Sequence, residues 1–339
     1  MKKLLPVNKP LSTCYQFMAF PLAILSKREE CEPWIFNNFI QTCFHKDYNN
    51  APVPSYFYIF DFAINPWLHV QRLQRDIIKS MNINIIELIK NAIDMEYYVT
   101  LNVDEFYIPE RIAYQKFHHT HDILVHGYDD ENETLMVLGF NEKMSFEVTT
   151  VRYWEFQKAF ENLDHIKNNC HQLFLYKYNS EGKYSFNVQL LIESLEDYLY
   201  SKNTSNRFSM VSEPWIRAYG MECYDYLKSY LNDFLIGNAK FDIRYLHFLY
   251  EHKLFMRERI KFLIKNNFLE DEDLVEEYQG IVETAILFRD IMLKNREEVN
   301  PIAVKKIINH IDNLAKYEFK VLEKLLVKLK EKFSDLSYV

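Results

Sequence analysis

The chain of 339 residues contains little glycine, an odd and irregularly spaced set of cysteines, and no long apolar run. Its six glycines lie too far apart to form the glycine-rich loops in which dinucleotide-binding and Walker-type sites hold phosphate. The five cysteines include no Cys-x-x-Cys pair, so their spacing predicts neither a disulfide framework nor a zinc ribbon. These shortages exclude the common nucleotide-binding and cysteine-scaffold classes.

An excess of positive charge is also missing. Lysine and arginine number 40 against 48 acidic residues, a formal net charge of −8, which argues against a nucleic-acid binder held by phosphate contacts. No stretch of about 18 apolar residues occurs, and the opening MKKLLPVNKPLST lacks the apolar segment of a signal peptide. We therefore expect a cytoplasmic protein that binds neither nucleic acid nor a membrane.

The hydrophobic pattern changes near residue 185. Before this point helical and strand patterns alternate, and after it nearly every segment has apolar residues spaced three and four apart. Helices are expected at 12–27, 33–44, 66–80, 83–95 and 153–165, and strands at 97–103, 122–128, 134–140, 145–151 and 172–178. Further helices are expected at 186–200, 213–235, 241–267, 271–296 and 301–333. The pattern predicts an α+β fold, with an antiparallel-sheet domain at 1–185 and a helical domain at 186–339.

Cys14 is the candidate nucleophile. Ser12 and Thr13 are candidate cap residues ahead of an apolar run, which puts Cys14, alone among the cysteines, at a predicted helix start. The partial positive charge at a helix amino terminus favours the thiolate, which is the reactive form of the side chain. The other cysteines are expected to be small buried hydrophobes.

His121 is the candidate general base, because it opens a predicted strand directly after a loop. A cysteine at a helix start and a histidine at a later strand start form the papain arrangement, in which the pair is remote in sequence and adjacent in space. If the strands 122–128 and 134–140 pair so that Tyr128 faces Glu133, His121 faces Phe140. Asn141 then lies beside His121 and can orient its imidazole as the third catalytic residue.

Two further residues are candidates for supporting roles. Asp104 is the second option for the residue that orients His121, if the loop that carries it folds back over the site. Asn8, six residues before Cys14, is the candidate side-chain donor to an oxyanion, together with the Cys14 backbone N–H.

A metal site is the alternative interpretation of His118, His119 and His121. On a strand, residues 119 and 121 share one face, and on a helix residues 118 and 121 do. No acidic or cysteine ligand has a spacing that completes the coordination sphere. We therefore expect no metal and no resident cofactor.

The segment HTHDILVHGYDDE resembles the histidine strand and Gly-Tyr-Asp segment of C39-like and related papain-fold proteins. Over nearly its full length the chain resembles the family whose amino-terminal domain is that of butirosin biosynthesis protein H. The shared elements are Cys14-Tyr15, Pro33-Trp34, VDEFYIP (103–109), His118, His121, Gly127-Tyr128-Asp129, Tyr219-Gly220 and LHFLYEHKLFMRERI (246–260). Relatives carry an acidic residue where this chain has Leu138-Gly139-Phe140, and this departure leaves Asn141 as the substitute.

The resemblance implies a papain-like cysteine-protease fold followed by a helical region, and an amide-forming acyltransferase. In that family the cysteine takes an acyl or peptidyl group from a carrier protein's pantetheine thioester and passes it to an amine or diamine. The products are peptide or polythioamide natural products, and the resemblance favours the second type. A cysteine peptidase and an inactive papain-fold scaffold are the alternatives. A basic run in the helical half is either a docking surface for an acidic carrier protein or, as its interleaving with Glu251 and Glu258 favours, a solvated helix face; it comprises His252, Lys253, Arg257, Arg259, Lys261 and Lys265.

Overall fold

A computed structural model describes residues 1–59, 61, 62, 64–166 and 171–334, so Cys170 lies outside the described residues. The chain divides into two compact units, residues 1–31 with 61–184 and residues 32–60 with 185–339. The break after residue 184 is one residue from the boundary predicted from the sequence. The segment 32–60, however, belongs to the second unit and not to the predicted amino-terminal domain. Arg259 explains this placement, because its buried guanidinium donates hydrogen bonds to the main-chain oxygens of Phe36, Asn38 and Phe39.

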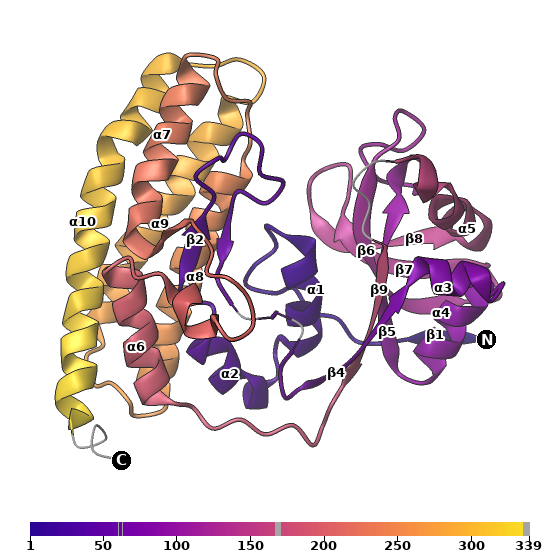
Figure 1. The fold of residues 1–339 in the computed structure, drawn as a ribbon, viewed down its shortest axis with the longest axis horizontal. Helices are drawn as coiled ribbons and strands as arrows, with labels where there is room; N and C mark the ends of the chain where they lie inside the picture. The colour runs from indigo at the N-terminus through magenta and orange to yellow at the C-terminus, as the bar shows by residue number, and fades with distance from the viewer. Residues whose placement is uncertain (60, 63, 167–170, 335–339) are drawn as a thin grey trace. The chain divides into compact units, whose positions relative to one another are not determined.

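Among the described residues, the first unit contains a seven-stranded antiparallel sheet (Figure 1). Its strands are β1 (Lys2–Leu4), β4 (Leu68–Gln74), β5 (Tyr97–Asp104), β6 (Thr120–Asp129), β7 (Thr134–Phe140), β8 (Phe146–Arg152) and β9 (Gln172–Tyr178). They are ordered β4-β9-β5-β6-β7-β8, and β1 pairs with β6. All five strands expected from their β-branched and aromatic residues are present, and the α+β class is confirmed.

The prediction of a helix at 66–80 was wrong in its first half. This segment forms β4 and then the short helix α3 (Arg75–Ser80). β4 pairs with β9 at the edge of the sheet, from Leu68 opposite Tyr178 to Gln74 opposite Gln172. The hydrogen bonds that make this segment a strand come from β9, about 100 residues later in the sequence. The periodicity of a short sequence window therefore does not predict them.

The other helices of the first unit are α1 (Gln16–Leu25), α4 (Ile85–Asp94) and α5 (Tyr153–Glu161), with short 3₁₀ turns η1 (Glu29–Cys31), η2 (Glu105–Tyr107) and η3 (Asn162–His165). α1 lies on one side of the sheet, and α4 and α5 lie on the other (Figure 1). β5 is buried on both faces along most of its length, as expected for a strand covered on both sides. The amino end of α4 is capped by Asn84, whose side chain accepts hydrogen bonds from two main-chain N–H groups.

The second unit is mainly helical. Its helices are α2 (Glu32–Asn37), α6 (Val188–Leu199), α7 (Cys223–Leu235), α8 (Arg244–Lys265), α9 (Asp273–Lys294) and α10 (Pro301–Lys332), with 3₁₀ turns η4 (Thr204–Phe208) and η5 (Gly220–Glu222). A small antiparallel sheet joins β10 (Ala218–Tyr219), β2 (Thr42–Phe44) and β3 (Ser55–Phe57). The helix expected at 33–44 therefore ends early, and the helix expected at 213–235 begins only at residue 223. None of the described helices combines the length and the apolarity needed to cross a membrane.

One carboxylate connects the five longest helices of the second unit. Lys253 Nζ on α8 lies 2.8 Å from Glu318 Oε2 on α10, and both side chains are almost completely buried. Tyr198 on α6, Tyr224 on α7 and Tyr278 on α9 also donate hydrogen bonds to this carboxylate. Because a buried charge is costly unless it is paired and hydrogen-bonded, this cluster selects one mutual arrangement of the helices.

Candidate active site

Cys14 lies two residues before the first residue of α1, Gln16. Tyr15, between them, is the N-cap and has an extended backbone, with φ −128° and ψ 118°. Cys14 is buried, with 9% of its surface exposed. It therefore lies just ahead of the helix end that carries partial positive charge.

Gln16 connects the Cys14 segment to the sheet. Its Nε2 donates to the main-chain oxygen of Asp122 at 2.6 Å and lies 3.4 Å from Nε2 of His121, the ring nitrogen that can accept from it. Its Oε1 accepts a hydrogen bond from the Phe140 N–H at 2.9 Å. Since Cys14 is only two residues away, its Cα lies within about 7 Å of that of Gln16. The cysteine segment and the histidine strand therefore meet through Gln16.

Gly139 on β7 makes this contact possible. A Cβ added at this position would lie 2.8 Å from Gln16 Oε1 and 3.4 Å from Nη2 of Arg111. Sequence reasoning did not select Gln16 or Arg111. One signal for Gln16 was its position as a lone amide at the start of an otherwise apolar helix. A second signal was Gly139 inside a predicted strand, because a glycine there often marks a place where another group approaches the backbone closely.

The imidazole of His121 is held by two acidic residues and by Gln16. Its Nδ1 lies 3.1 Å from Glu105 Oε1, and its Nε2 lies 3.8 Å from Asp122 Oδ1. A carboxylate can only accept, so the contact with Glu105 assigns the proton to Nδ1 and leaves the lone pair on Nε2.

The surroundings favour the charged form of the imidazole. Burial lowers the pKa of His121, but the hydrogen bond to Glu105 and the charges of Asp122 and Glu105 outweigh it, so its pKa is raised above the usual value. Burial also raises the pKa of Asp122, although His121 and Gln16 act in the opposite direction. A raised histidine pKa favours a thiolate–imidazolium pair if the thiol approaches.

Glu105 orients His121 in the structure, and sequence reasoning did not select it. The 103–109 loop does fold back towards the site, but Asp104 turns to another histidine: its Oδ2 lies 2.6 Å from Nδ1 of His118. The backbone explains the difference, because the Glu105 N–H donates to the His119 oxygen at 2.8 Å and so continues the β5–β6 ladder. Side chains alternate between the two faces along a strand, so Glu105 and Asp104 point to opposite sides.

Asn141 closes the β7–β8 turn and does not contact His121. Its Oδ1 accepts hydrogen bonds from the N–H groups of Lys143 and Ser145, each at 2.9 Å, and its amide donates to Glu147. The side chain that was expected to orient the imidazole is therefore committed to the turn.

The predicted register of the β6–β7 hairpin was wrong. Tyr128 pairs with Leu135 and not with Glu133, and a bulge between Val125 and Gly127 shifts the ladder by one residue. The register already differs beside the turn, where Asp129 pairs with Thr134, and the bulge reduces this difference farther along the strand.

Asn8 lies at the other end of α1. Its Nδ2 donates to the main-chain oxygen of Ser26 at 3.0 Å, and its N–H donates to that of Ala23. α1 has ten residues, and at 1.5 Å per residue this separates Asn8 from the Cys14 end by about 15 Å. Asn8 is therefore not placed to donate to an oxyanion at Cys14.

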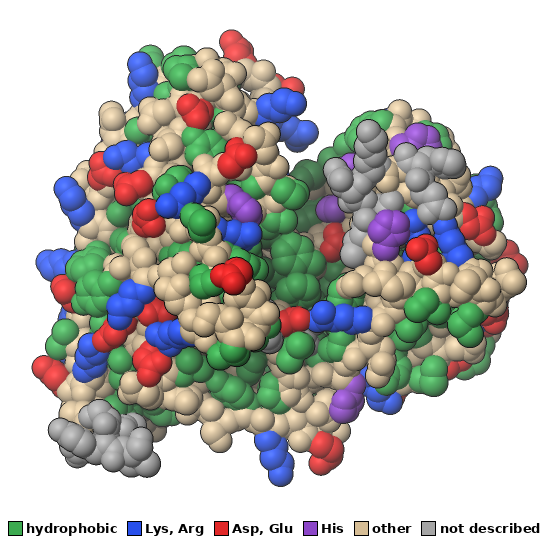
Figure 2. All heavy atoms as spheres, in the orientation of Figure 1, with side chains coloured by type: hydrophobic (Ala, Val, Ile, Leu, Met, Phe, Trp, Pro, Cys, Tyr) green, Lys and Arg blue, Asp and Glu red, His purple; other side chains and the backbone are tan. Residues whose placement is uncertain are grey.

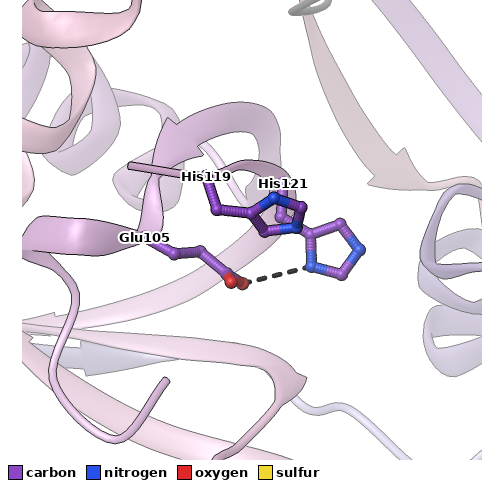
Figure 3. Close-up of side chains that lie close together, drawn as sticks. All are labelled: Glu105, His119 and His121. Atoms are coloured by element: carbon purple, nitrogen blue, oxygen red, sulfur yellow. Dashed lines mark hydrogen bonds and ion pairs between the residues drawn. The ribbon is translucent and has the colours of Figure 1, made fainter. Parts of the chain in front are cut away.

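Glu105, His119 and His121 form a group of potential metal ligands. One ligand atom from each residue lies within 4.8 Å of the others, and Figure 3 shows the carboxylate and the two imidazoles gathered at one point. Sequence reasoning had named both histidines but found no acidic partner. The partner is Glu105, which comes from the neighbouring strand's end.

The basic run in α8 is not a continuous exposed surface. His252, Lys253 and Arg259 are buried, while Lys261 and Arg257 pair with Glu258. Acidic and basic side chains are interspersed over the face of the second unit seen in Figure 2. The expected docking surface for an acidic carrier protein is therefore not found at this run, because half of its charges serve the interior.

No family model matches this chain, and comparison with curated proteins finds no significant match. The functional assignment therefore rests on the residues and geometry described above.

Proposed function

We propose that the chain is a papain-like cysteine acyltransferase that forms amides through an acyl-Cys14 intermediate, with His121 as the general base. One observation carries this proposal: Gln16, two residues after Cys14, contacts the His121 imidazole and holds the cysteine segment against β6 and β7. Glu105 takes the orienting role in place of Asn141. A general base must come within hydrogen-bond reach of the nucleophile in the substrate complex, and the anchoring of the Cys14 segment beside His121 supports this pairing.

The reaction proceeds in two balanced halves. His121 Nε2 takes the thiol proton as the Cys14 sulfur attacks the thioester carbonyl carbon. The bond from that carbon to the carrier's pantetheine sulfur breaks, and this sulfur takes the proton from the imidazolium. The amine nitrogen then attacks acyl-Cys14, His121 removes the amine proton, and the Cys14 sulfur leaves and is reprotonated.

Arg111 is the side-chain donor that we propose for the oxyanion. Only 2% of its surface is exposed, and within the described residues neither Nη1 nor Nη2 has a hydrogen-bond partner. Its Nη2 and Gln16 Oε1 both lie over Gly139. Buried N–H donors without a hydrogen-bond acceptor cost free energy that an anionic group in the site would offset.

The substrates follow from the same chemistry. We propose a carrier-protein pantetheine thioester as the acyl donor, because exchange between two thioesters is nearly isoenergetic. An amine or diamine is the acceptor, since aminolysis of a thioester is downhill. A reduced thiol is required throughout, so we place the reaction in the cytoplasm.

The test is to incubate the protein with an acyl-pantetheine thioester, then add an amine, and follow the intact mass. We expect one acyl adduct that disappears on adding the amine, and no adduct in Cys14→Ala, which has no nucleophile at this position. Cys31→Ala is the matched control, because Cys31 is buried in the same unit and burial raises the pKa of its thiol to about 12. An adduct that persists in Cys14→Ala refutes the proposal. Peptide cleavage without an adduct supports a peptidase, and a wild-type protein inert in both assays supports a scaffold.

A further inference from the structure

The ends of β5 and β6 place three ligand-type side chains on one face. In the antiparallel ladder Val103 pairs with His121 and Asp104 with Thr120, and the backbone bond from Glu105 to His119 extends the same pairing. Directly opposed residues share a face, and so do residues two apart on one strand. Glu105, His119 and His121 therefore point to the same side, as a consequence of the register.

The separations within this group suit a metal ion after small side-chain rotations. The ligand atoms lie within 4.8 Å of one another, and His121 Nδ1 is 3.1 Å from Glu105 Oε1 (Figure 3). With metal–ligand bonds of about 2.0–2.1 Å, a tetrahedral site separates its nitrogen and oxygen ligands by about 3.3 Å. His119 is exposed and can make the remaining movement.

The backbone that carries these ligands is held by buried polar contacts. Asp104, which is completely buried, accepts a hydrogen bond from the His119 N–H at 3.2 Å. Asn102 donates to Thr120 Oγ1 at 3.1 Å, between the two histidines. Supporting contacts of this kind fix the direction of metal ligands.

We propose that Glu105, His119 and His121 bind a divalent transition-metal ion of the zinc class. Two imidazoles and one carboxylate are the donor set of open three-ligand sites, whereas Mg²⁺ and Ca²⁺ prefer oxygen ligands alone. At His121 the negative charges of Glu105 and Asp122 outweigh the positive charge of Arg111. The local charge therefore favours a cation.

Such an ion blocks the thiol chemistry. A metal bound to His121 and Glu105 removes the oriented base from Cys14, so the two states of the site exclude each other. This consequence rests on the proposed function, whereas metal binding itself does not. The site then acts as a reversible inhibitory switch, closed by zinc and opened by a chelator.

Binding is tested by titrating the chelator-treated full chain with Zn²⁺ against a chromophoric chelator. We expect one equivalent to bind, and His119→Ala and Glu105→Gln to weaken the affinity at least about tenfold. His118→Ala is the matched control, because His118 is also exposed but turns to Asp104, and it should keep the wild-type affinity. Equal affinities of the wild type and His119→Ala overturn the site, as does an equal loss in His118→Ala.

Inhibition is tested by the rate of Cys14 acylation with and without Zn²⁺, expressed as a ratio for each variant. The ratio should fall at least about tenfold in the wild type at a zinc concentration ten times its dissociation constant. The zinc concentration needed should rise in His119→Ala in proportion to its lost affinity, and Mg²⁺ should have no effect. Zinc binding without any metal-free acylation overturns the proposed function alone. Acylation that zinc at saturation does not slow overturns the switch.

Discussion

Replacing Gln16 by leucine tests the contact on which the proposed function depends. The substitution keeps the size of the side chain but leaves the Phe140 N–H and the Asp122 main-chain oxygen without their partner, at 2.9 and 2.6 Å respectively. Each unsatisfied buried group costs about 1–3 kcal/mol. Phe140 and Asp122 are only half-buried, so water reaches them in part. We therefore expect a loss of about 2–3 kcal/mol in the unfolding free energy.

The loss of the contact should affect acylation more than stability. Without Gln16 the Cys14 segment is no longer held against His121, and a displacement of about 1 Å between reacting groups can cost about 100-fold in rate. Intact-mass measurements give the rate of Cys14 acylation. Hydrogen exchange of the β6 and β7 amides reports the stability of the first unit separately from the second.

Gln157→Leu is the matched control, because this glutamine lies in the same unit and its side chain donates to Glu161 of its own helix at an exposed position. Its stability should change by less than about 0.5 kcal/mol. If Gln16→Leu acylates at the wild-type rate and its β7 amides keep their protection, Gln16 does not position Cys14 and our reasoning fails.

Three further predictions follow from the packing. Gly139→Ala should destabilise the first unit by about 1–3 kcal/mol, because its Cβ meets the Gln16 side chain. Gly280→Ala in α9, where no heavy atom lies near the Cβ position, should stabilise the protein by about 0.5–1 kcal/mol. Urea unfolding measures the free energy of unfolding of both variants, and a stable Gly139→Ala contradicts the predicted clash. Lys253→Met should lower the free energy of unfolding by about 3–5 kcal/mol, because the Glu318 carboxylate loses its buried cation. The double variant Lys253→Met with Glu318→Gln should recover part of this stability in the same assay. A double variant that is no more stable than Lys253→Met contradicts a charge effect. His252 is buried beside Lys253, and burial, then the lysine charge, lowers its pKa well below the usual value. As the pH falls, the unfolded chain therefore takes up this proton before the folded protein does. The contribution of His252 to the free energy of unfolding is fully present above about pH 6.5 and is lost by up to about 1.4 kcal/mol per pH unit below it. His252→Gln should reduce this pH dependence, and an unchanged dependence contradicts the assignment to His252.

Local patterns determined most of the elements. The strands β5, β7 and β9 and the helices α8, α9 and α10 lie where alternation or spacing of three and four predicted them. These periods arise within one element, so a short window of sequence contains them. The same holds for the positions of Cys14 ahead of a helix and of His121 at a strand start.

Contacts between remote segments decided the rest. β4 is a strand because β9 pairs with it, and the segment 32–60 joins the second unit because Arg259 binds its carbonyl groups. The turn between Asp129 and Thr134 and the bulge in β6 together set the hairpin register, and Asn141 hydrogen-bonds within the turn after β7.

The candidate site shows the same division. The sequence by itself determined which thiol and which imidazole are candidates, because each follows from its own element. Only the tertiary structure decided that Glu105, and not Asn141 or Asp104, contacts the His121 imidazole, and that Gln16 joins the segment after Cys14 to this ring. A residue's strand face depends on its position in a ladder, and that ladder is set by pairing across the sheet, which no single segment encodes.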